Sequence, residues 1–107
     1  MNIGFILTKT PFEEGFSTFI KFINIYMGKE DINVYLLGNG IYAAKKEHKH
    51  AHSMHNILKK CSVYSYLPDM DARGISSNHL IEGIQLVESY DDIIVDLMEK
   101  MDQILSF

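Results

Sequence analysis

The chain begins with a continuous apolar run, and four further runs of similar character follow along its length. The first run covers residues 2–8, NIGFILT, and ends at a turn signal. The others cover residues 32–37, about 61–66, 84–87 and 103–107. Short apolar runs that end at turn signals are typical of strands buried on both faces of a sheet. The pattern therefore predicts five strands.

A long amphipathic segment separates the first two runs. Thr10-Pro11-Phe12-Glu13 offers an N-cap, a proline for the first helical position and a glutamate for a capping box. Gly28 is a natural helix stop. Apolar side chains recur between these signals at spacings of three and four, so one helix face is expected to be buried. That face comprises Phe12, Phe16, Phe19, Ile20, Ile23 and Met27.

Shorter helical segments are predicted between the remaining strands. They cover about residues 50–60, residues 68–74 and a brief turn from Ser77. The last helix starts at Ser89, because Asp91 and Asp92 suit the positive end of a helix. Its predicted apolar face comprises Ile94, Leu97, Met98 and Met101. Residues 41–49 are ambiguous.

The alternation of strands and helices defines the expected fold class. Strands that alternate with helices form a parallel sheet, because right-handed crossovers carry the chain back across its faces. No repeat, low-complexity tract or linker interrupts the pattern. We therefore predict one domain, residues 1–107, with a three-layer α/β/α sandwich around a five-stranded parallel sheet.

Composition narrows the range of functions. The net charge of −4 and the absence of a basic run argue against nucleic-acid binding, which needs a positive footprint. No apolar stretch approaches the ~20 residues of a membrane helix, and the first residues lack the pattern of a signal peptide. The chain has one cysteine, which cannot form an internal disulfide. A reducing cytoplasmic location is expected.

Four of the five histidines gather in EHKHAHSMH, residues 47–55. If this stretch is helical, His48, His52 and His55 fall at i, i+4 and i+7 along one flank of the helix. Imidazoles at such spacing can converge on Zn²⁺, Ni²⁺ or Cu²⁺. No carboxylate or cysteine completes a familiar motif, so a solvated helix surface is the competing interpretation.

Two loops could expose backbone N–H groups to an anion. Gly38-Asn39-Gly40 follows the second predicted strand, and Lys9 with Thr10 precedes the first helix. The glycine loop lacks the longer fingerprints of nucleotide sites. A tight turn at the glycine loop and ordinary helix capping at Lys9 and Thr10 are favoured over ligand binding, and no cofactor is expected.

Several of these segments together resemble the DsrE/DsrF/DsrH and TusD group of small sulfur-relay proteins. The similarity covers nearly the whole chain. It includes the Thr-Pro-Phe helix start, YLLGNGIY, ILKK before the third strand, DARGI after it, IEGIQLV and the closing DQILSF. The resemblance implies a five-stranded parallel sheet and assembly into a trimer or hexamer, either as a homo-oligomer or as a subunit of a DsrE-type complex.

The resemblance also places a sulfur-carrying cysteine just after the third strand, seven residues before the arginine of an Arg-Gly pair. Counting back from Arg73 reaches Tyr66, and a second cysteine position of the group falls at Asp69. The only cysteine is Cys61, five residues before Tyr66, or roughly 16 Å along an extended strand at ~3.3 Å per residue. Because Tyr66 and Asp69 have no thiol, neither of the two positions at which the resemblance places a cysteine can carry sulfur.

The residues around Tyr66 suggest binding rather than chemistry. Tyr64 and Tyr66 point to the same side of a regular strand, where an aromatic ring can fill the pocket of the missing thiol or contact a neighbouring subunit. Arg73 can bind an anion, or it can pair with Asp69 or Asp71.

Three functional hypotheses follow. The first is a non-catalytic, oligomeric binding or scaffolding subunit. The second is a sulfurtransferase that uses Cys61, whose thiol Lys59 and Lys60 would activate if all three were exposed; burial in the core is the competing interpretation. The third is a metal-binding module built on the histidine cluster.

Overall fold

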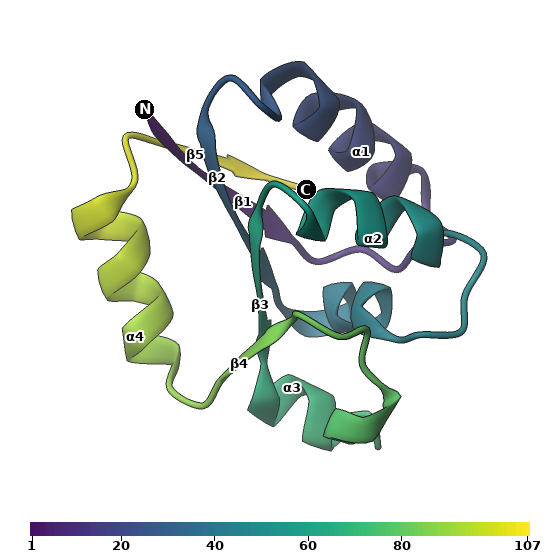
Figure 1. Ribbon diagram of the computed structural model, residues 1–107. Coiled ribbons are helices and arrows are strands. Elements are labelled where there is room, and N and C mark those ends of the chain that lie inside the picture. The colour runs from purple at the N-terminus through teal and green to yellow at the C-terminus, as the bar shows by residue number, and fades with distance from the viewer.

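The computed structural model describes residues 1–107 and contains a five-stranded sheet in which all neighbouring strands are parallel (Figure 1). The strand order is β4-β3-β2-β1-β5. The strands are β1 Asn2–Leu7, β2 Asp31–Leu36, β3 Ser62–Tyr66, β4 Gln85–Val87 and β5 Gln103–Ser106. The predicted α/β class and parallel sheet are confirmed.

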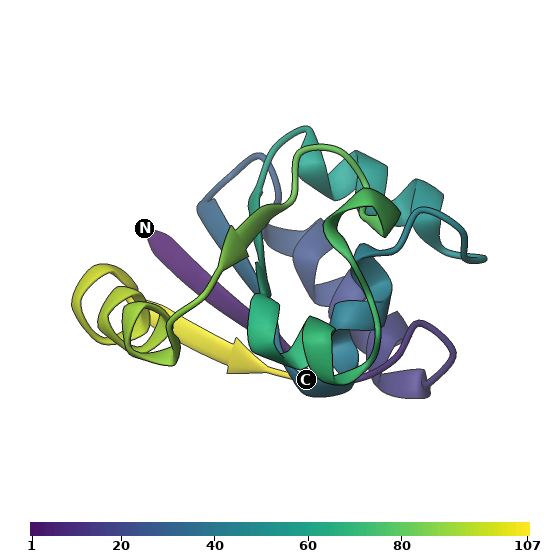
Figure 2. The ribbon, with the colours of Figure 1, turned by 90° about the horizontal axis from the view of Figure 1, so that it is seen from below.

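Helices lie on both faces of the sheet. Helices α1 (Glu14–Tyr26) and α2 (Ala51–Leu58) cover one face, and α4 (Tyr90–Val95) lies on the other, as Figures 1 and 2 show from two directions. Helix α4 continues into a π-helical turn, η3 (Asp96–Lys100). The β2–α2 connection contains the 3₁₀ helix η1 (Gly38–Ala44). The chain thus forms the three expected layers.

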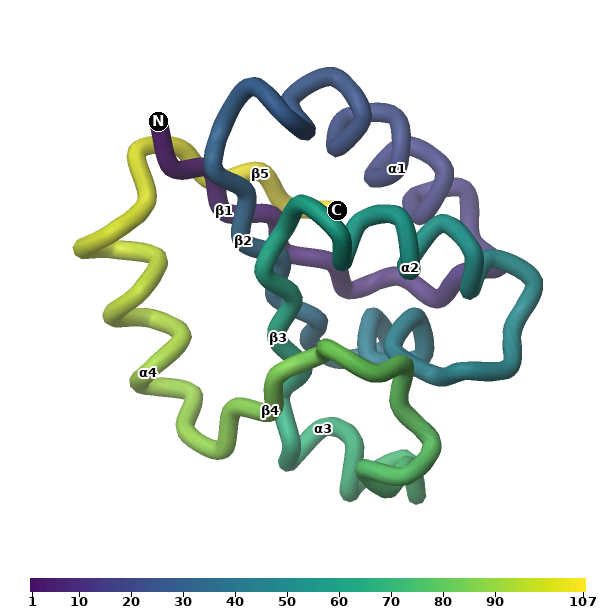
Figure 3. Tube along the Cα trace, in the orientation of Figure 1, coloured from purple at the N-terminus to yellow at the C-terminus, as the bar shows by residue number.

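The β3–β4 connection returns across the same face of the sheet as α1 and α2, where Ile75, Leu80 and Ile81 are buried in the core of that side. It contains the short helix α3 (Leu67–Ala72) and the 3₁₀ turn η2 (Ser77–His79), beyond the carboxyl end of β3 (Figure 1). After α4, the chain returns so that β5 lies beside β1, and the first and last strands are neighbours (Figure 3).

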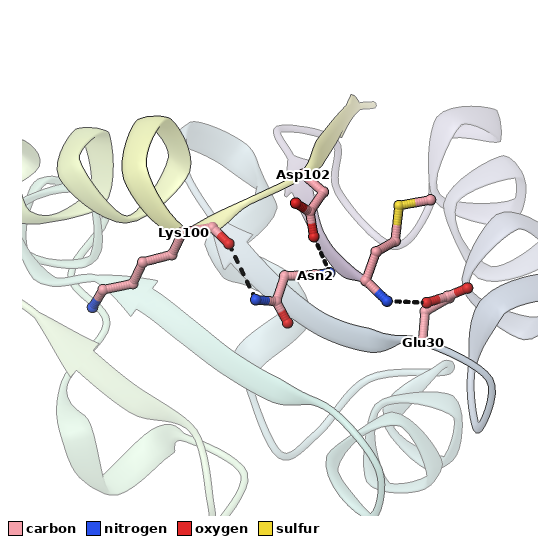
Figure 4. Close-up of polar contacts among 5 residues, drawn as sticks. Asn2, Glu30, Lys100 and Asp102 are labelled. Carbon is pink, nitrogen blue, oxygen red and sulfur yellow. Dashed lines mark hydrogen bonds and ion pairs between the residues drawn. The ribbon is translucent and has the colours of Figure 1, made fainter.

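Polar contacts fasten the amino end of β1 to its neighbours (Figure 4). The backbone N–H of Asn2 donates to the Asp102 carboxylate at 2.8 Å, and the Asn2 side-chain amide donates to the Lys100 carbonyl at 3.2 Å. The amino group of Met1 contacts Glu30. These contacts hold the start of β5 and the residues before β2 against β1.

The hydrophobic core is unequal on the two sides of the sheet. Nineteen buried side chains form one cluster on the α1 and α2 side, with Phe5, Phe16 and Phe19 among the largest. The α4 side has a cluster of three, Tyr35, Ile93 and Leu97. Most of the apolar burial therefore lies beneath α1 and α2, and α4 packs over a smaller interface.

The predicted start of α1 was wrong. The Glu13 carboxylate accepts the Thr10 N–H at 2.6 Å, as in a capping box, but the residues between them form a turn and the helix begins at Glu14. Phe12 therefore lies outside the helix and is 75% exposed, so it does not belong to the buried face. Phe16, Phe19 and Ile23 are buried as predicted.

The predicted apolar face of α4 was partly wrong. Ile93 and Leu97 are buried, whereas Ile94 is half-buried and Met98 is 78% exposed. The residues 96–100 form a π-helical turn, in which the hydrogen bonds span five residues and the side chains are rotated relative to an α-helix. A regular 3.6-residue period consequently fails in this half of the helix.

The loop after β2 is also more ordered than the sequence suggested. Gly38 and Asn39 begin the 3₁₀ helix η1, which includes residues 41–44 of the ambiguous segment 41–49. Gly40 is buried against β1, and a Cβ atom at this position would stand 1.9 Å from the Leu7 carbonyl oxygen. Only glycine permits this close approach.

None of the helices is both long enough and apolar enough to cross a lipid bilayer.

Candidate functional site

A polar network joins the loop after β2 to the helix after β3. The backbone N–H of Gly38 donates to the Asp69 carboxylate at 2.7 Å. Arg73 donates from Nε to the Asn39 side-chain oxygen at 3.0 Å and from Nη1 to the Asp69 carbonyl at 3.1 Å. This network lies at the carboxyl end of neighbouring parallel strands, where open α/β sheets bind ligands.

The network determines what the predicted anion-binding groups contact. The Gly38 N–H faces a protein carboxylate, and the Gly40 N–H donates to the Leu37 carbonyl at 2.8 Å. Arg73 also approaches the Asp69 carboxylate at 3.9 Å, so it pairs with Asp69 rather than Asp71. These donors already have partners within the chain, and they hold the edge of the sheet together.

Tyr66 is the last residue of β3 and the N-cap residue of α3. Its ring packs against Tyr90 at the start of α4, with the ring centres 5.8 Å apart. Tyr64 stacks on Tyr35 of β2 with the ring centres 5.2 Å apart. Both side chains therefore face the α4 side of the sheet, and an aromatic ring occupies the position where the resemblance places sulfur.

Cys61 lies at the other end of β3, directly before the strand. Its side chain is half-buried, and burial raises the pKa of the Cys61 thiol to about 11, although nearby Lys60 acts in the opposite direction. A shallow pocket of about 430 Å³ adjoins it and includes Lys59, Lys60 and Asp31. At neutral pH the thiol is protonated, so it is a poor nucleophile.

The histidine cluster does not have the spacing that the sequence suggested. Helix α2 begins at Ala51, so His48 lies before the helix, and the prediction of one helical flank is wrong for this residue. His48 Nε2 lies 3.0 Å from the Ala43 carbonyl, and Nδ1 accepts the His50 N–H at 3.0 Å. Both ring nitrogens are thus engaged by the backbone.

His52 and His55, the other two proposed ligands, lie on exposed positions of α2. No group of three or more His, Cys, Asp or Glu side chains gathers in a geometry that could hold a metal ion. For His48, burial lowers the pKa more than the Ala43 contact raises it. The geometry fits a neutral imidazole that holds two loop segments together.

Thr10 lies in a pocket of about 300 Å³ between the β1–α1 loop and the segment after η1. The pocket wall includes Phe12, Tyr42, Lys45 and His48. Lys9 does not line it and instead packs its aliphatic stem near Gly15. Of the two predicted residues in this loop, only Thr10 therefore faces a recess.

Sequence reasoning missed a partly buried polar contact on the α4 side. The Tyr35 hydroxyl donates to the Asp96 carboxylate at 3.4 Å, and burial together with this carboxylate raises the pKa of Tyr35 well above its usual range. Asp96 in turn pairs with Lys100 at 2.9 Å. Tyr35 lies within an apolar run and is far from Asp96 along the chain, so no local sequence pattern predicts the contact between them.

The sheet order, the β3–β4 connection with its two short helical segments and the residues at the end of β3 define a small α/β protein of the DsrE-like fold. A family model described as "DsrH like protein" matches residues 9–104. The chain therefore belongs to the DsrH-like family, within the DsrE/DsrF/DsrH group of sulfur-relay proteins. The resemblance seen in the sequence is confirmed.

One relative is similar to the chain in sequence, and two solved structures are similar to it in fold. The uncharacterized protein MJ0989 of Methanocaldococcus jannaschii is 26% identical over 121 aligned positions, which cover the whole of both chains. The structure of MTH1491 from Methanobacterium thermoautotrophicum, a protein of unknown function, matches with a TM-score of 0.86 at 14% identity, over 99% of this chain and 98% of its own. The ychN protein of E. coli matches with a TM-score of 0.82 at 19% identity, over 100% and 99%. The two structures support the fold alone.

Proposed function

We propose that this chain is a non-catalytic member of its family, which binds or scaffolds partner proteins in an oligomeric complex in the cytoplasm. The observation that carries this proposal is the position and packing of the Tyr66 side chain. Its ring packs on Tyr90 at the end of β3, where the resemblance places the sulfur-carrying cysteine. The one thiol of the chain lies at the opposite end of that strand and has a raised pKa.

The polar network at the strand ends supports the same proposal. In a sulfur carrier, the groups around the reactive thiol must be free to contact a sulfur donor or acceptor. Here Gly38, Asn39, Asp69 and Arg73 contact one another. Their interactions stabilise the frame of the family site, and they leave fewer free donors for an anionic substrate. The expected assembly is a homo-oligomer, a trimer or hexamer, or a place in a mixed DsrE-type complex.

Persulfide transfer tests the proposal directly. The protein is incubated with glutathione persulfide, and its intact mass is measured under non-reducing conditions. We expect no added sulfur on the wild-type chain. Addition of a sulfur atom that Cys61→Ser abolishes would overturn the proposal and establish the alternative sulfurtransferase.

A second variant tests whether the frame of the site is retained. In Cys61→Ser/Tyr66→Cys, the only thiol stands at the end of β3, beside Tyr90. We expect this variant to accept sulfur from the same donor, whereas Cys61→Ser alone does not. If the double variant also stays unmodified while remaining folded by circular dichroism, the end of β3 is not the outline of a sulfur site.

A further inference from the structure

The outer side of α4 and of η3 carries apolar side chains that the rest of the chain leaves largely exposed. Met98 is 78% exposed and Val95 45%, and Tyr90, whose ring packs on Tyr66, is 50% exposed. Val95 and Met98 are three residues apart, a spacing that places helical side chains close together. The inward side of the same segment is occupied by Ile93 and Leu97, so these exposed residues are not needed to attach α4 to the sheet.

The segment that carries these apolar residues is rich in carboxylates. Residues 88–102 contain six acidic side chains and one lysine, Lys100, which pairs with Asp96 at 2.9 Å. The remaining five acidic residues have no cationic partner in the structure. They are Glu88, Asp91, Asp92, Glu99 and Asp102. The start of the helix accounts for Asp91 and Asp92 in part, and Asp102 accepts the Asn2 N–H, so Glu88 and Glu99 are the carboxylates without such a role.

The opposite layer carries the opposite charge. Residues 45–60, which form the segment before α2, the helix and the two residues after it, contain five lysines and one glutamate. Because α2 and α4 lie on opposite faces of the sheet, charge is separated across the molecule (Figure 2). The net charge of −4 conceals this separation.

This separation bears on what can cover α4. Two copies that met through their α4 surfaces would bring like charges together, which disfavours an isologous dimer. An α4 surface could contact the basic α2 surface of another copy. Such a contact would be heterologous and would join surfaces on opposite faces of the sheet, an arrangement that favours an open chain of copies over a small closed ring. A different chain fits this surface better than a second copy does.

We propose that the outer side of α4 docks a different protein that presents lysine or arginine side chains around an apolar socket for Met98. The inference rests on the proposed role as a binding subunit and names the chemistry of its partner. The flexible thioether of Met98 suits an inserted apolar contact, and the acidic rim selects a cationic surface. The π-helical turn presents Met98 outward, and such turns occur often at functional sites.

A defined peptide serves as the probe. A synthetic amphipathic helix of leucines and lysines is titrated into the full chain, and binding is followed by calorimetry; a peptide with glutamates in place of the lysines is the control. We expect the lysine peptide alone to bind, with an affinity that falls as salt is raised. Equal binding of both peptides, or of neither, would overturn the proposal.

Met98→Asp separates docking from simple charge attraction. The substitution adds a negative charge, so attraction alone would strengthen binding of the lysine peptide. Loss of the apolar contact should instead weaken it about tenfold or more. Phe12→Asp is the matched control, because Phe12 is 75% exposed in a distant loop and the charge change is the same. We expect it to leave the affinity unchanged.

Two other results would count against the docking surface. If the Met98→Asp variant binds the lysine peptide as tightly as the wild type does, Met98 is not part of the contact with the peptide. A fall in the native mass of the purified protein on Met98→Asp substitution would show that a second copy covers α4. Failure of the proposed non-catalytic function would give a different result. In that case the protein would accept sulfur on Cys61, and it would still bind the lysine peptide.

Discussion

The Gly38 N–H and the Asp69 carboxylate lie 2.7 Å apart, although 31 residues separate them along the chain. This hydrogen bond connects the loop after β2 with the helix after β3. Asp69 also pairs with Arg73, which reaches Asn39 of the same loop. One carboxylate thus organises the carboxyl edge of two neighbouring strands.

Asp69→Ala is expected to destabilise the protein by about 1–2 kcal/mol, because it removes a charge-assisted hydrogen bond and leaves the Gly38 N–H without its partner. Chemical denaturation measures the free energy of unfolding. Asp71→Ala is the matched control in the same short helix, since Asp71 is exposed and its side chain makes no hydrogen bond or ion pair. It should change stability by no more than about 0.5 kcal/mol. Equal effects would refute the role given to Asp69.

Gly40→Ala is expected to cost about 3 kcal/mol or more, because the new Cβ would stand 1.9 Å from the Leu7 carbonyl oxygen and would force η1 away from β1. Gly38→Ala provides the comparison within the same loop. Gly38 has a φ of 54°, but nothing lies within 4 Å of its Cβ position, so only the backbone penalty of about 1 kcal/mol applies. Thermal and chemical unfolding of both variants test the difference. Similar losses of stability in the two variants would mean that η1 can move away from β1 without cost, which would contradict the prediction.

Cys61 should react slowly with a thiol reagent in the native protein at neutral pH and rapidly after unfolding, because its pKa is about 11. The raised pKa also predicts the direction of a pH effect on stability. The unfolded thiol ionises near pH 9.0 and the folded thiol about two units higher, so ionisation favours unfolding between these values. Stability should fall as the pH rises through this window, and less steeply in Cys61→Ser. Rapid native labelling at pH 7 would contradict the prediction.

His48 predicts a pH effect in the acidic range. Its Nδ1 accepts the His50 N–H, and protonation would replace this acceptor with a second donor. Because burial lowers its folded pKa below the ordinary 6.5, the stabilising contact is fully present above that pH and is lost as the pH falls below it. His48→Gln should show a smaller loss of stability on acidification than the wild type. His52→Ala, on the exposed side of α2, should retain the wild-type dependence.

The sequence predicted the strands well because each is a short run with little competing pattern. The strand positions, the parallel sheet and the burial of Phe16 and Phe19 follow from local periodicity. The exposure of Phe12 and Met98 did not follow. A turn held by Glu13 and a π-helical turn shift these residues off the helical period, and both depend on hydrogen bonds that a sequence pattern does not display.

Those parts of the candidate site that depend on local sequence pattern were also predictable. The position of Tyr66 at the end of β3 was predicted by counting back from Arg73. Strand alternation predicted that the Tyr64 and Tyr66 side chains lie on the same face of the sheet. The pairing of Asp69 with Gly38 and of Tyr35 with Asp96 joins residues far apart in sequence. Such contacts depend on how the loops pack in three dimensions, and spacing along the chain does not reveal them.

The tyrosine pairs on the α4 side of the sheet have a spectroscopic consequence. The chain has no tryptophan and six tyrosines, and four of these lie in the two ring pairs of this layer. Near-ultraviolet circular dichroism and tyrosine emission will therefore report mainly on this one interface. A change in these signals with unchanged far-ultraviolet dichroism would reveal α4 separating from the sheet while the α1 and α2 side of the protein stays folded.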